Sequence, residues 1–552
     1  MRFKLPTLIR RAVPMVIVTL TAIAVACTQD KLAPTGLQKL SARRSNQLQS
    51  TTFKGSSRRR SVEDQSVRLA NEIAGFGGLY LTPSRELVAF VKDTTSLGTL
   101  RTAATTALRA HLSSDGFGLP IRSRPSSVRV IPGNYDWQTL SGYRDFISDS
   151  LLGEHGVAMV DIDVVNNRVA VRVKSTYAGG AAELTQILTN HNIPLAAIGI
   201  SLGSAPGNSS SPRAVATTAR RFTPTFSALN DNDPDSLMGG VKFVTPAGSC
   251  SIGAVVDSAG HTRLLSASHC SQTMWALDYS LAKTFNGNVI GRETADPAPG
   301  TACNAFICWF HRGSDDSLWS MDSTYGVAHA KIGVIGRTSS RDSSALTVPF
   351  NVSLDSSHPF LYIYDTLTSS SLVVGAEIDK VGQRTGWQKG PVTHICLDYW
   401  LDSNSKKVYC AGEAHITLMH GDSGGPMFIW DGADGALMVG TANAEDPVYS
   451  PSNDSVFTGV LFSPWSSILT ELGPIDPRNN TTVGTPSLTA VDSSGFAKLS
   501  WSAVSTTNTS STTQYQIFQW TWDASTSSYT ENGVLATTIT SCRTRTVERR
   551  GP

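Results

Sequence analysis

The stretch Gly421-Asp422-Ser423-Gly424-Gly425-Pro426 decides the fold and the chemistry that the sequence predicts. Glycines on both sides of a serine let the backbone turn sharply and leave the hydroxyl open. They also direct backbone N–H groups at one point, and the amides of Gly421 and Ser423 are the candidates for holding an oxyanion there. The alternative is a glycine-rich turn without chemistry, but such a turn does not require all six identities. The stretch therefore predicts a nucleophilic serine at position 423.

A serine needs a base that takes its proton, and the candidate base is His269. It follows two predicted strands, 252–256 and 263–267, which are joined by a turn at 257–260. A disulfide between Cys250 and Cys270 would close this hairpin and hold the histidine at its exit. The other histidines near the serine in sequence lack such a setting; they are His394, His415 and His420.

The third member of such a site is a buried carboxylate that orients the imidazole. The segment 314–319 offers Asp315 and Asp316. Here the pattern resembles the trypsin/chymotrypsin-like serine peptidase family, through Ser-Ala-Ser-His-Cys at 266–270 and Gly-Asp-Ser-Gly-Gly-Pro at 421–426. In that family the catalytic Asp is followed by any residue, a small residue and two apolar residues. Asp315 fits this pattern and Asp316 does not.

The resemblance covers about 238–474 and implies a mainly β fold of two perpendicular antiparallel barrels, each of six strands. It also implies a serine endopeptidase that works through an acyl-enzyme, with its triad in the cleft between the barrels. Two smaller segments agree: 382–387 resembles a Gly-Arg-Thr-Thr-Gly-Trp stretch of bacterial members, and 460–472 resembles the closing strand and terminal helix. In many relatives the residue at Asp422 pairs with a new N-terminus. No clean start of that kind is present, so we do not expect this form of activation.

The candidate residues of the specificity pocket are Thr417, His420, Asn443 and Glu445. Trypsin-type members carry an acid six residues before the nucleophile, where this chain has Thr417. The resemblance therefore implies cleavage after apolar or small residues. Two alternatives stay open: Glu445 supplies the missing negative charge, or His420 favours an acidic residue.

Eight cysteines indicate an oxidising compartment, and six of them lie between 250 and 410. Six cysteines allow fifteen pairings, and the simplest expectation is local pairing. The expected pairs are Cys250–Cys270, Cys303–Cys308 and Cys396–Cys410. No CxxC pair occurs, so we expect no zinc site, and nothing in the sequence indicates a metal or a cofactor.

The N-terminus predicts export. A basic lead, an apolar run at 13–25 and Ala24-Val25-Ala26 are typical of a cleaved signal peptide at 1–26. Ile23–Cys27 resembles a bacterial lipoprotein box, which makes Cys27 a candidate for lipidation at the cell envelope. The competing interpretation is ordinary cleavage and release outside the cell.

The remaining segments predict several domains in the 552 residues. A flexible tether is expected at 27–65, an α/β pro-region at 66–203, linkers at 204–237 and 475–482, and a partial fibronectin type III-like tail at 483–552. Within the pro-region we expect strands at 87–92 and 128–131, a helix at 137–151 and a hairpin at 157–174. The pro-region is expected to help the peptidase fold and then to be cut away; a permanent accessory or inhibitory domain is the alternative.

Composition limits the partners. Forty-six basic and forty-four acidic residues leave a formal net charge of +2, which argues against nucleic acid as a partner. Peptide substrates, the chain's own pro-region and a monomeric state are expected instead. A surface adhesion or binding protein built on an inactive peptidase scaffold is the alternative function, and an esterase acting on small esters is a further one. Because all three triad residues and the glycines are present, the peptidase interpretation is favoured.

Overall fold

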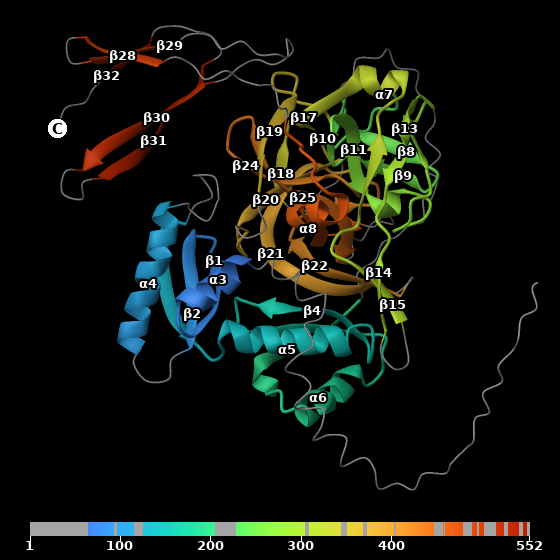
Figure 1. Cartoon of the computed structure of the whole chain (residues 1–552), viewed down its shortest axis with the longest axis vertical. Coiled ribbons are helices and arrows are strands. Elements are labelled where there is room, and N and C mark those ends of the chain that lie inside the picture. The colour runs from blue at the N-terminus through green and yellow to red at the C-terminus, as the bar shows by residue number, and fades with distance from the viewer. Residues whose placement is uncertain are drawn as a thin grey trace, which may run out of the picture. The chain divides into compact units, whose positions relative to one another are not determined.

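The computed structural model describes residues 64–92, 97–114, 125–204, 228–303, 308–343, 350–367, 372–401, 405–446, 456–457, 459–478, 488–493, 496–501, 515–523, 528–539 and 545–548. The expected signal peptide, Cys27 and nearly all of the tether lie outside these residues. The chain is mainly β, as predicted (Figure 1). Among the described helices, none combines the length and apolar character needed to cross a membrane.

Residues 64–204 form an α/β unit. Its helices are α3 Asp64–Glu72, α4 Leu97–Ser114, α5 Trp137–Ser150 and α6 Gly180–Asn190, with a short 3-10 helix η3 at Leu195–Ala197. Its strands are β1 Phe76–Leu81, β2 Glu86–Lys92, β3 Ser127–Gly133, β4 Val157–Asp163, β5 Arg168–Lys174 and β6 Ile198–Gly203. The helix α5 begins where predicted because Asp136 caps it, accepting a hydrogen bond from the Thr139 amide at 2.7 Å. The hairpin β4–β5 also lies where predicted.

The first barrel sheet runs in the order β10-β11-β16-β13-β12-β8-β9. Its strands are β8 Lys242–Thr245, β9 Gly248–Ser251, β10 Ala254–Ser258, β11 His261–Ala267, β12 Leu281–Lys283, β13 Val289–Ala295 and β16 Asp316–Ser320. The strands β10 and β11 run closer to their turn than predicted. Only Ala259 and Gly260 connect them, and both have positive φ, 53° and 79°, as a tight two-residue hairpin turn requires.

Register within this sheet positions two candidate site residues. In the antiparallel pair β11–β16, Ala267 lies opposite Asp316. His269 comes two residues after the end of this register and Asp315 one residue before it. Both therefore emerge at the same edge of the sheet, although 46 residues separate them in the chain.

Six strands of the second sheet close into a ring, in the order β20-β21-β22-β27-β25-β24 and back to β20. They are β20 Glu377–Gly382, β21 Gly386–Leu401, β22 Lys406–Ala414, β24 Pro426–Trp430, β25 Gly435–Asp446 and β27 Gly459–Pro464, and α8 Trp465–Leu472 follows directly. The turn that carries Ser423 connects into β24 of this ring. The remaining elements in this part are β7 Leu237–Gly239, η4 Ser268–Cys270, β14 Gly300–Cys303, β15 Cys308–Arg312, α7 Thr324–His329, β17 Ala330–Gly336, β18 Arg341–Ser343, β19 Phe360–Thr366, β23 Leu418–Met419 and β26 Val456–Phe457.

The α/β unit continues the second sheet. Strand β4 pairs antiparallel with β21, with Val160 opposite Asp398 and Met159 opposite Tyr399. Buried apolar side chains of both segments belong to one cluster, which includes Val157 of β4 and Val392 of β21. The two segments thus share a sheet and a core.

The predicted linker at 204–237 ends earlier than expected. Residues 205–227 lie outside the described ranges, but Leu229 is fully buried and makes backbone hydrogen bonds with Val352 and Lys242. Leu229 and Leu237 therefore pack in the barrel core, while Asn230, Asn232 and Asp235 of the same stretch stay exposed.

The tail contains the strands β28 Leu488–Ser493, β29 Phe496–Trp501, β30 Tyr515–Asp523, β31 Ser528–Ile539 and β32 Arg545–Glu548. They pair as β28-β29-β32 and as β30-β31. The fibronectin-like interpretation of this tail stays a prediction.

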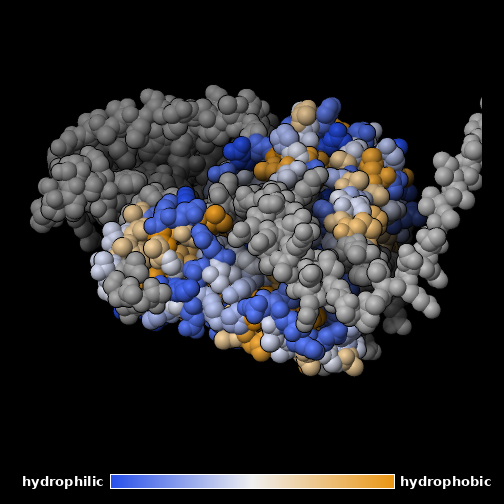
Figure 2. Space-filling model, turned by 60° about the horizontal axis from the view of Figure 1, so that its bottom comes forward, coloured by the Kyte–Doolittle hydropathy of each residue, from blue (hydrophilic) through white to orange (hydrophobic). Residues whose placement is uncertain are grey.

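Some large apolar side chains are exposed. On the face that Figure 2 shows, hydrophobic residues occur in small groups among hydrophilic ones. The most exposed are Leu202, Val327 and Tyr279, and Leu277, Phe285 and Val289 of the segment around Tyr279 are exposed as well. Single exposed apolar residues are usual on a protein surface.

Candidate active site

His269 and Asp315 contact each other at the edge of the first barrel. The Nδ1 atom of His269 lies 2.6 Å from Oδ2 of Asp315. The carboxylate is fully buried and the imidazole is 10% exposed. The backbones are tied as well, because the Ser268 amide donates to the Asp315 carbonyl at 2.8 Å. This arrangement holds the ring with its other nitrogen, Nε2, available for a proton transfer.

The surroundings of His269 raise the pKa of its imidazole and so stabilise the protonated form. Burial alone would lower the pKa of His269, but the charge and the hydrogen bond of Asp315 outweigh burial and raise it above its usual value. The charges of Glu445 and Asp316 act in the same direction. A proton on the His269 imidazole is therefore stabilised by its surroundings.

Asp316, the second acid of the sequence pair, takes a different place. One oxygen of its buried carboxylate accepts a hydrogen bond from Thr441 Oγ1. Burial raises the pKa of Asp316 to about 7, against the lowering effect of its hydrogen bonds. Of the two candidates, Asp315 is the one that the structure brings to the histidine.

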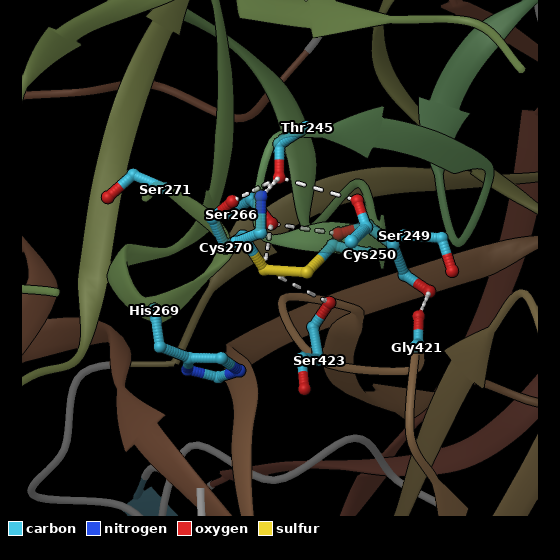
Figure 3. Close-up of a disulfide and its surroundings, with 12 residues drawn as sticks. Thr245, Ser249, Cys250, Ser266, His269, Cys270, Ser271, Gly421 and Ser423 are labelled. Carbon is cyan, nitrogen blue, oxygen red and sulfur yellow. Dashed lines mark hydrogen bonds between the residues drawn. A yellow bond between two sulfur atoms is a disulfide. The ribbon is translucent and has the colours of Figure 1, made fainter. Parts of the chain in front are cut away.

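Ser423 lies beside the disulfide between Cys250 and Cys270, and Cys270 directly follows His269. Cys250 and Cys270 are joined, with their Cα atoms 6.2 Å apart. The Ser423 carbonyl accepts the Ser251 amide at 2.9 Å and lies 4.0 Å from the Cys270 sulfur. Figure 3 shows the imidazole of His269 and the hydroxyl of Ser423 on the same side of this disulfide. Among the described residues no hydrogen bond joins Ser423 Oγ to His269; such contacts are often long without substrate and tighten when it binds.

The turn around Ser423 leaves two amides unused. Gly421 and Gly424 have positive φ, 98° and 81°, which side chains rarely adopt. The other amides of the turn donate to backbone carbonyls: Asp422 to Met419, Gly424 to Ala442 and Gly425 to Asp422. Within the described part of the chain, the amides of Gly421 and Ser423 have no acceptor. These are the two donors that the sequence nominates for an oxyanion hole.

Asp422 has a buried lysine as its partner. Lys380 Nζ lies 2.7 Å from Asp422 Oδ2, and both side chains are fully buried. Lys380 also donates to Thr385 Oγ1 at 2.6 Å, and the amides of Arg384 and Thr385 donate to Asp422 Oδ1. Burial would raise the pKa of Asp422, but the charge of Lys380 and these hydrogen bonds hold it below its usual value.

No motif in the sequence points to Lys380. It lies in the strand β20, whose positions 378–382 are all buried. A lysine at a buried strand position needs a partner. The expectation that no new N-terminus pairs with Asp422 is consistent with this internal cation.

The candidate pocket residues are mostly buried. Thr417, Asn443 and Glu445 are 0%, 4% and 7% exposed. Thr417 Oγ1 has no hydrogen-bond partner in the described residues, while the Asn443 amide contacts Ser463 Oγ. The negative charge of Glu445 is one of the groups that raise the pKa of His269.

His420 differs from these pocket candidates because it is half-buried. Burial lowers the pKa of His420, and the charges of Arg384 and His269 lower it further. The neutral form of the His420 imidazole is therefore favoured.

The other four central cysteines are joined as Cys303–Cys308 and Cys396–Cys410. Together with Cys250–Cys270, these are the three local pairs expected from the sequence. Disulfides persist in oxidising compartments, so the three bonds are consistent with an exported protein.

Comparison with solved structures finds bacterial serine proteases. Thermobifida fusca Protease A is 14% identical, covering 44% of this chain and 98% of its own, with a TM-score of 0.30. A Nocardiopsis protease is 15% identical, over 44% of this chain and 100% of its own, also with a TM-score of 0.30. An alpha-lytic protease homologue is 15% identical, over 44% of this chain and 100% of its own, with a TM-score of 0.30. No protein-family model matches the chain, and no curated protein matches it.

Proposed function

We propose that this chain is an exported serine endopeptidase in which Ser423 is the nucleophile, His269 the general base and Asp315 the residue that orients the base. One observation carries the proposal. The buried 2.6 Å contact between His269 Nδ1 and Asp315 Oδ2 lies next to a serine turn that has two unused amides. A turn with a purely structural role needs neither feature.

The chemistry follows from these positions. Ser423 Oγ attacks the carbonyl carbon of the substrate while His269 Nε2 takes the hydroxyl proton. The carbonyl oxygen becomes an oxyanion, and the amides of Gly421 and Ser423 stabilise it. His269 then returns the proton to the leaving amine, which breaks the peptide bond and leaves an acyl-enzyme. Water releases the acyl group by the same steps, with the histidine again acting as the base.

The test combines the variant Ser423→Ala with labelling by a fluorophosphonate probe, which reacts preferentially with an activated serine. Ser423 carries the one hydroxyl of the turn at 421–426, so an adduct on this turn identifies it. In the wild-type chain we expect one adduct, located on Ser423 by peptide mapping, and hydrolysis of casein or peptides. In the variant both should be lost, since removal of such a nucleophile costs roughly six orders of magnitude in kcat.

The matched control is Ser466→Ala, which removes a buried serine hydroxyl from α8 that has no hydrogen-bond partner in the described residues. This variant should label and hydrolyse like the wild type. Turnover by Ser423→Ala at more than a few percent of the wild-type rate would refute the proposal. A folded wild-type chain that neither labels nor hydrolyses would favour a binding protein on an inactive scaffold.

Substrate choice is proposed from the pocket candidates. Because Thr417 carries no charge and is fully buried, cleavage should favour apolar or small residues before the scissile bond. The buried Glu445 and the half-buried His420 are the two groups that would change this preference toward basic or acidic residues. Profiling with a peptide library tests all three, and dominant cleavage after Lys or Arg would refute the apolar preference.

We further propose that residues 66–203 are a pro-region that assists folding of the barrels and is then removed. The pairing of β4 with β21 supports a templating role, since it adds a preformed hairpin to a strand of the second ring. The hydroxyl of Ser148 also donates to Asp398 at 2.5 Å in the buried interface. Barrels depend on pairings between distant strands, which fold slowly without such help.

The test is refolding of residues 228–474 in the Ser423→Ala form, with and without residues 66–203 supplied in trans; the fragment begins at 228 so that it keeps the buried Leu229. A faster rate or a higher yield with the added segment is expected. Equal rates and yields would favour a permanent accessory or inhibitory domain. Export and the lipidation of Cys27 are tested separately, by metabolic labelling with a fatty-acid analogue in the wild type and in Cys27→Ala.

A further inference from the structure

We propose that the indole N–H of Trp275 is a positioning group for the catalytic carboxylate. This inference rests on the proposed function. Trp275 Nε1 donates to Asp315 Oδ1 at 3.0 Å, while the other oxygen of the same carboxylate contacts His269 Nδ1 at 2.6 Å. The two donors lie on opposite oxygens, so together they set the direction in which the carboxylate faces the base.

The chemistry of the indole suits this role. Its N–H only donates, so it interacts favourably with the ionised carboxylate and cannot accept a proton from it. Hydrogen bonds to a charged acceptor are stronger than those between neutral groups. Both Trp275 and Asp315 are buried, at 2% and 0% exposure, so water competes little for this contact.

The backbone of Trp275 adopts a strained conformation that hydrogen bonds hold in place. Trp275 has a φ of 65°, in the left-handed region that bulky residues rarely adopt. Its amide donates to Ser268 Oγ at 2.7 Å, and the same hydroxyl donates to Asp296 Oδ2 at 2.7 Å. Since Ser268 directly precedes His269, the loop that carries the indole is tied to the segment that carries the base. Strained conformations of this kind persist where the surroundings hold them.

Two cations flank the ring. The guanidinium of Arg312 lies 5.7 Å and the ammonium of Lys406 5.1 Å from the Trp275 ring, both within the range of cation–π attraction. Arg312 is itself held by ion pairs with Asp296 at 2.6 Å and Glu471 at 2.9 Å. Lys406 donates to the Met274 carbonyl at 3.0 Å. The Trp275 ring is therefore held by its own backbone contact with Ser268 and by the two cations, Arg312 and Lys406, that flank it.

The test is Trp275→Phe, which removes the N–H and keeps an aromatic ring, in the full chain. Activity is expressed per active site titrated with fluorophosphonate, so that misfolded molecules do not count. We expect kcat to fall by roughly tenfold or more with KM within about twofold, because the contact acts on the triad and not on the substrate. The acid limb of kcat/KM should move to higher pH, since a carboxylate with one donor fewer stabilises the imidazolium more strongly.

The matched control is Trp309→Phe, because the indole N–H of this buried tryptophan has no hydrogen-bond partner in the described residues. It should leave kcat per titrated site and the pH profile unchanged. If Trp275→Phe lowers only the number of titratable sites, with kcat per site and the acid limb at wild-type values, the role is structural and the proposal is wrong. An unchanged Trp275→Phe variant would also overturn it.

A spectroscopic measurement separates this proposal from the proposed function. In chains with ¹⁵N-labelled indoles and Ser423→Ala, the signal assigned to Trp275 by its loss in Trp275→Phe should shift when Asp315→Asn is introduced. The Trp309 signal should not shift. Absence of hydrolysis in the wild type would refute the peptidase but leave this shift measurable, whereas a Trp275 signal insensitive to Asp315→Asn would refute the hydrogen bond itself.

Discussion

Replacing Lys380 by methionine should lower the free energy of unfolding. It should also disturb the turn that carries Ser423, because Asp422 of this turn is the partner of Lys380. Lys380 and Asp422 are both fully buried, and Nζ lies 2.7 Å from Oδ2. Removing one partner of a buried pair typically costs about 3–5 kcal/mol, because the other charge stays buried without compensation. Asp422 keeps other donors, from the amides of Arg384, Thr385 and Met419 and from the Thr385 hydroxyl. We therefore expect the lower end of the range, about 3 kcal/mol.

The measurement is urea unfolding at pH 7 in the Ser423→Ala background, which prevents self-digestion. At a slope of about 3 kcal/mol/M, the expected loss moves the midpoint by roughly 1 M. The lowered pKa of Asp422 determines how this stabilisation changes with pH. Stability from a carboxylate with a lowered pKa is present above its usual pKa and lost as the pH falls through the lowered one. At pH 7 the contribution of the ionised Asp422 carboxylate is therefore present in full.

The matched control is Lys389→Met. Lys389 also pairs with an acid, Glu377, at 3.0 Å, but the two side chains are 31% and 48% exposed. Such a pair contributes at most about 1 kcal/mol. The double variant Lys380→Met with Asp422→Asn should recover part of the loss, since it leaves no buried charge from this pair. A loss below about 1 kcal/mol for Lys380→Met, equal to that of the control, would refute the reasoning.

Asp315→Asn should lower kcat by roughly 10⁴-fold, because the amide favours the wrong imidazole tautomer, whereas Asp316→Asn should stay within about threefold of the wild type; kinetics of the purified variants test both. His394 of β21 lies 2.8 Å from Asp161 of β4 and 3.5 Å from Glu413. Burial lowers the pKa of His394, but these two carboxylates outweigh burial and raise the pKa to about 9. The contact between the α/β unit and the barrels should therefore be strongest below about pH 6.5 and weaken as the pH rises toward 9, a dependence that His394→Gln should remove in a binding titration. Because the general base must be neutral and its pKa is raised from 6.5, the acid limb of kcat/KM should have its midpoint above pH 6.5; a midpoint below about 6 would contradict this.

The features that the sequence alone determined are local ones. The turn at 421–426 follows from glycines that adopt positive φ at Gly421 and Gly424. The hairpin β4–β5 follows from apolar-rich segments on both sides of a turn at 164–167, which contains Asn166 and Asn167. The three disulfides join cysteines separated by 20, 5 and 14 residues. In each case the residues that decide the structure lie within one short segment, so their pattern can be seen in the sequence.

Tertiary structure decided which residues serve this turn and the candidate base. Lys380 lies 42 residues before Asp422, and Trp275 lies 40 residues before Asp315. Neither pair has a pattern in the sequence, because closure of the second ring and the path of a loop bring them together. The burial of Leu229 and the pairing of β4 with β21 were hidden for the same reason. A buried charge or donor finds its partner through the register of distant strands, and that register is set only when the whole sheet has formed.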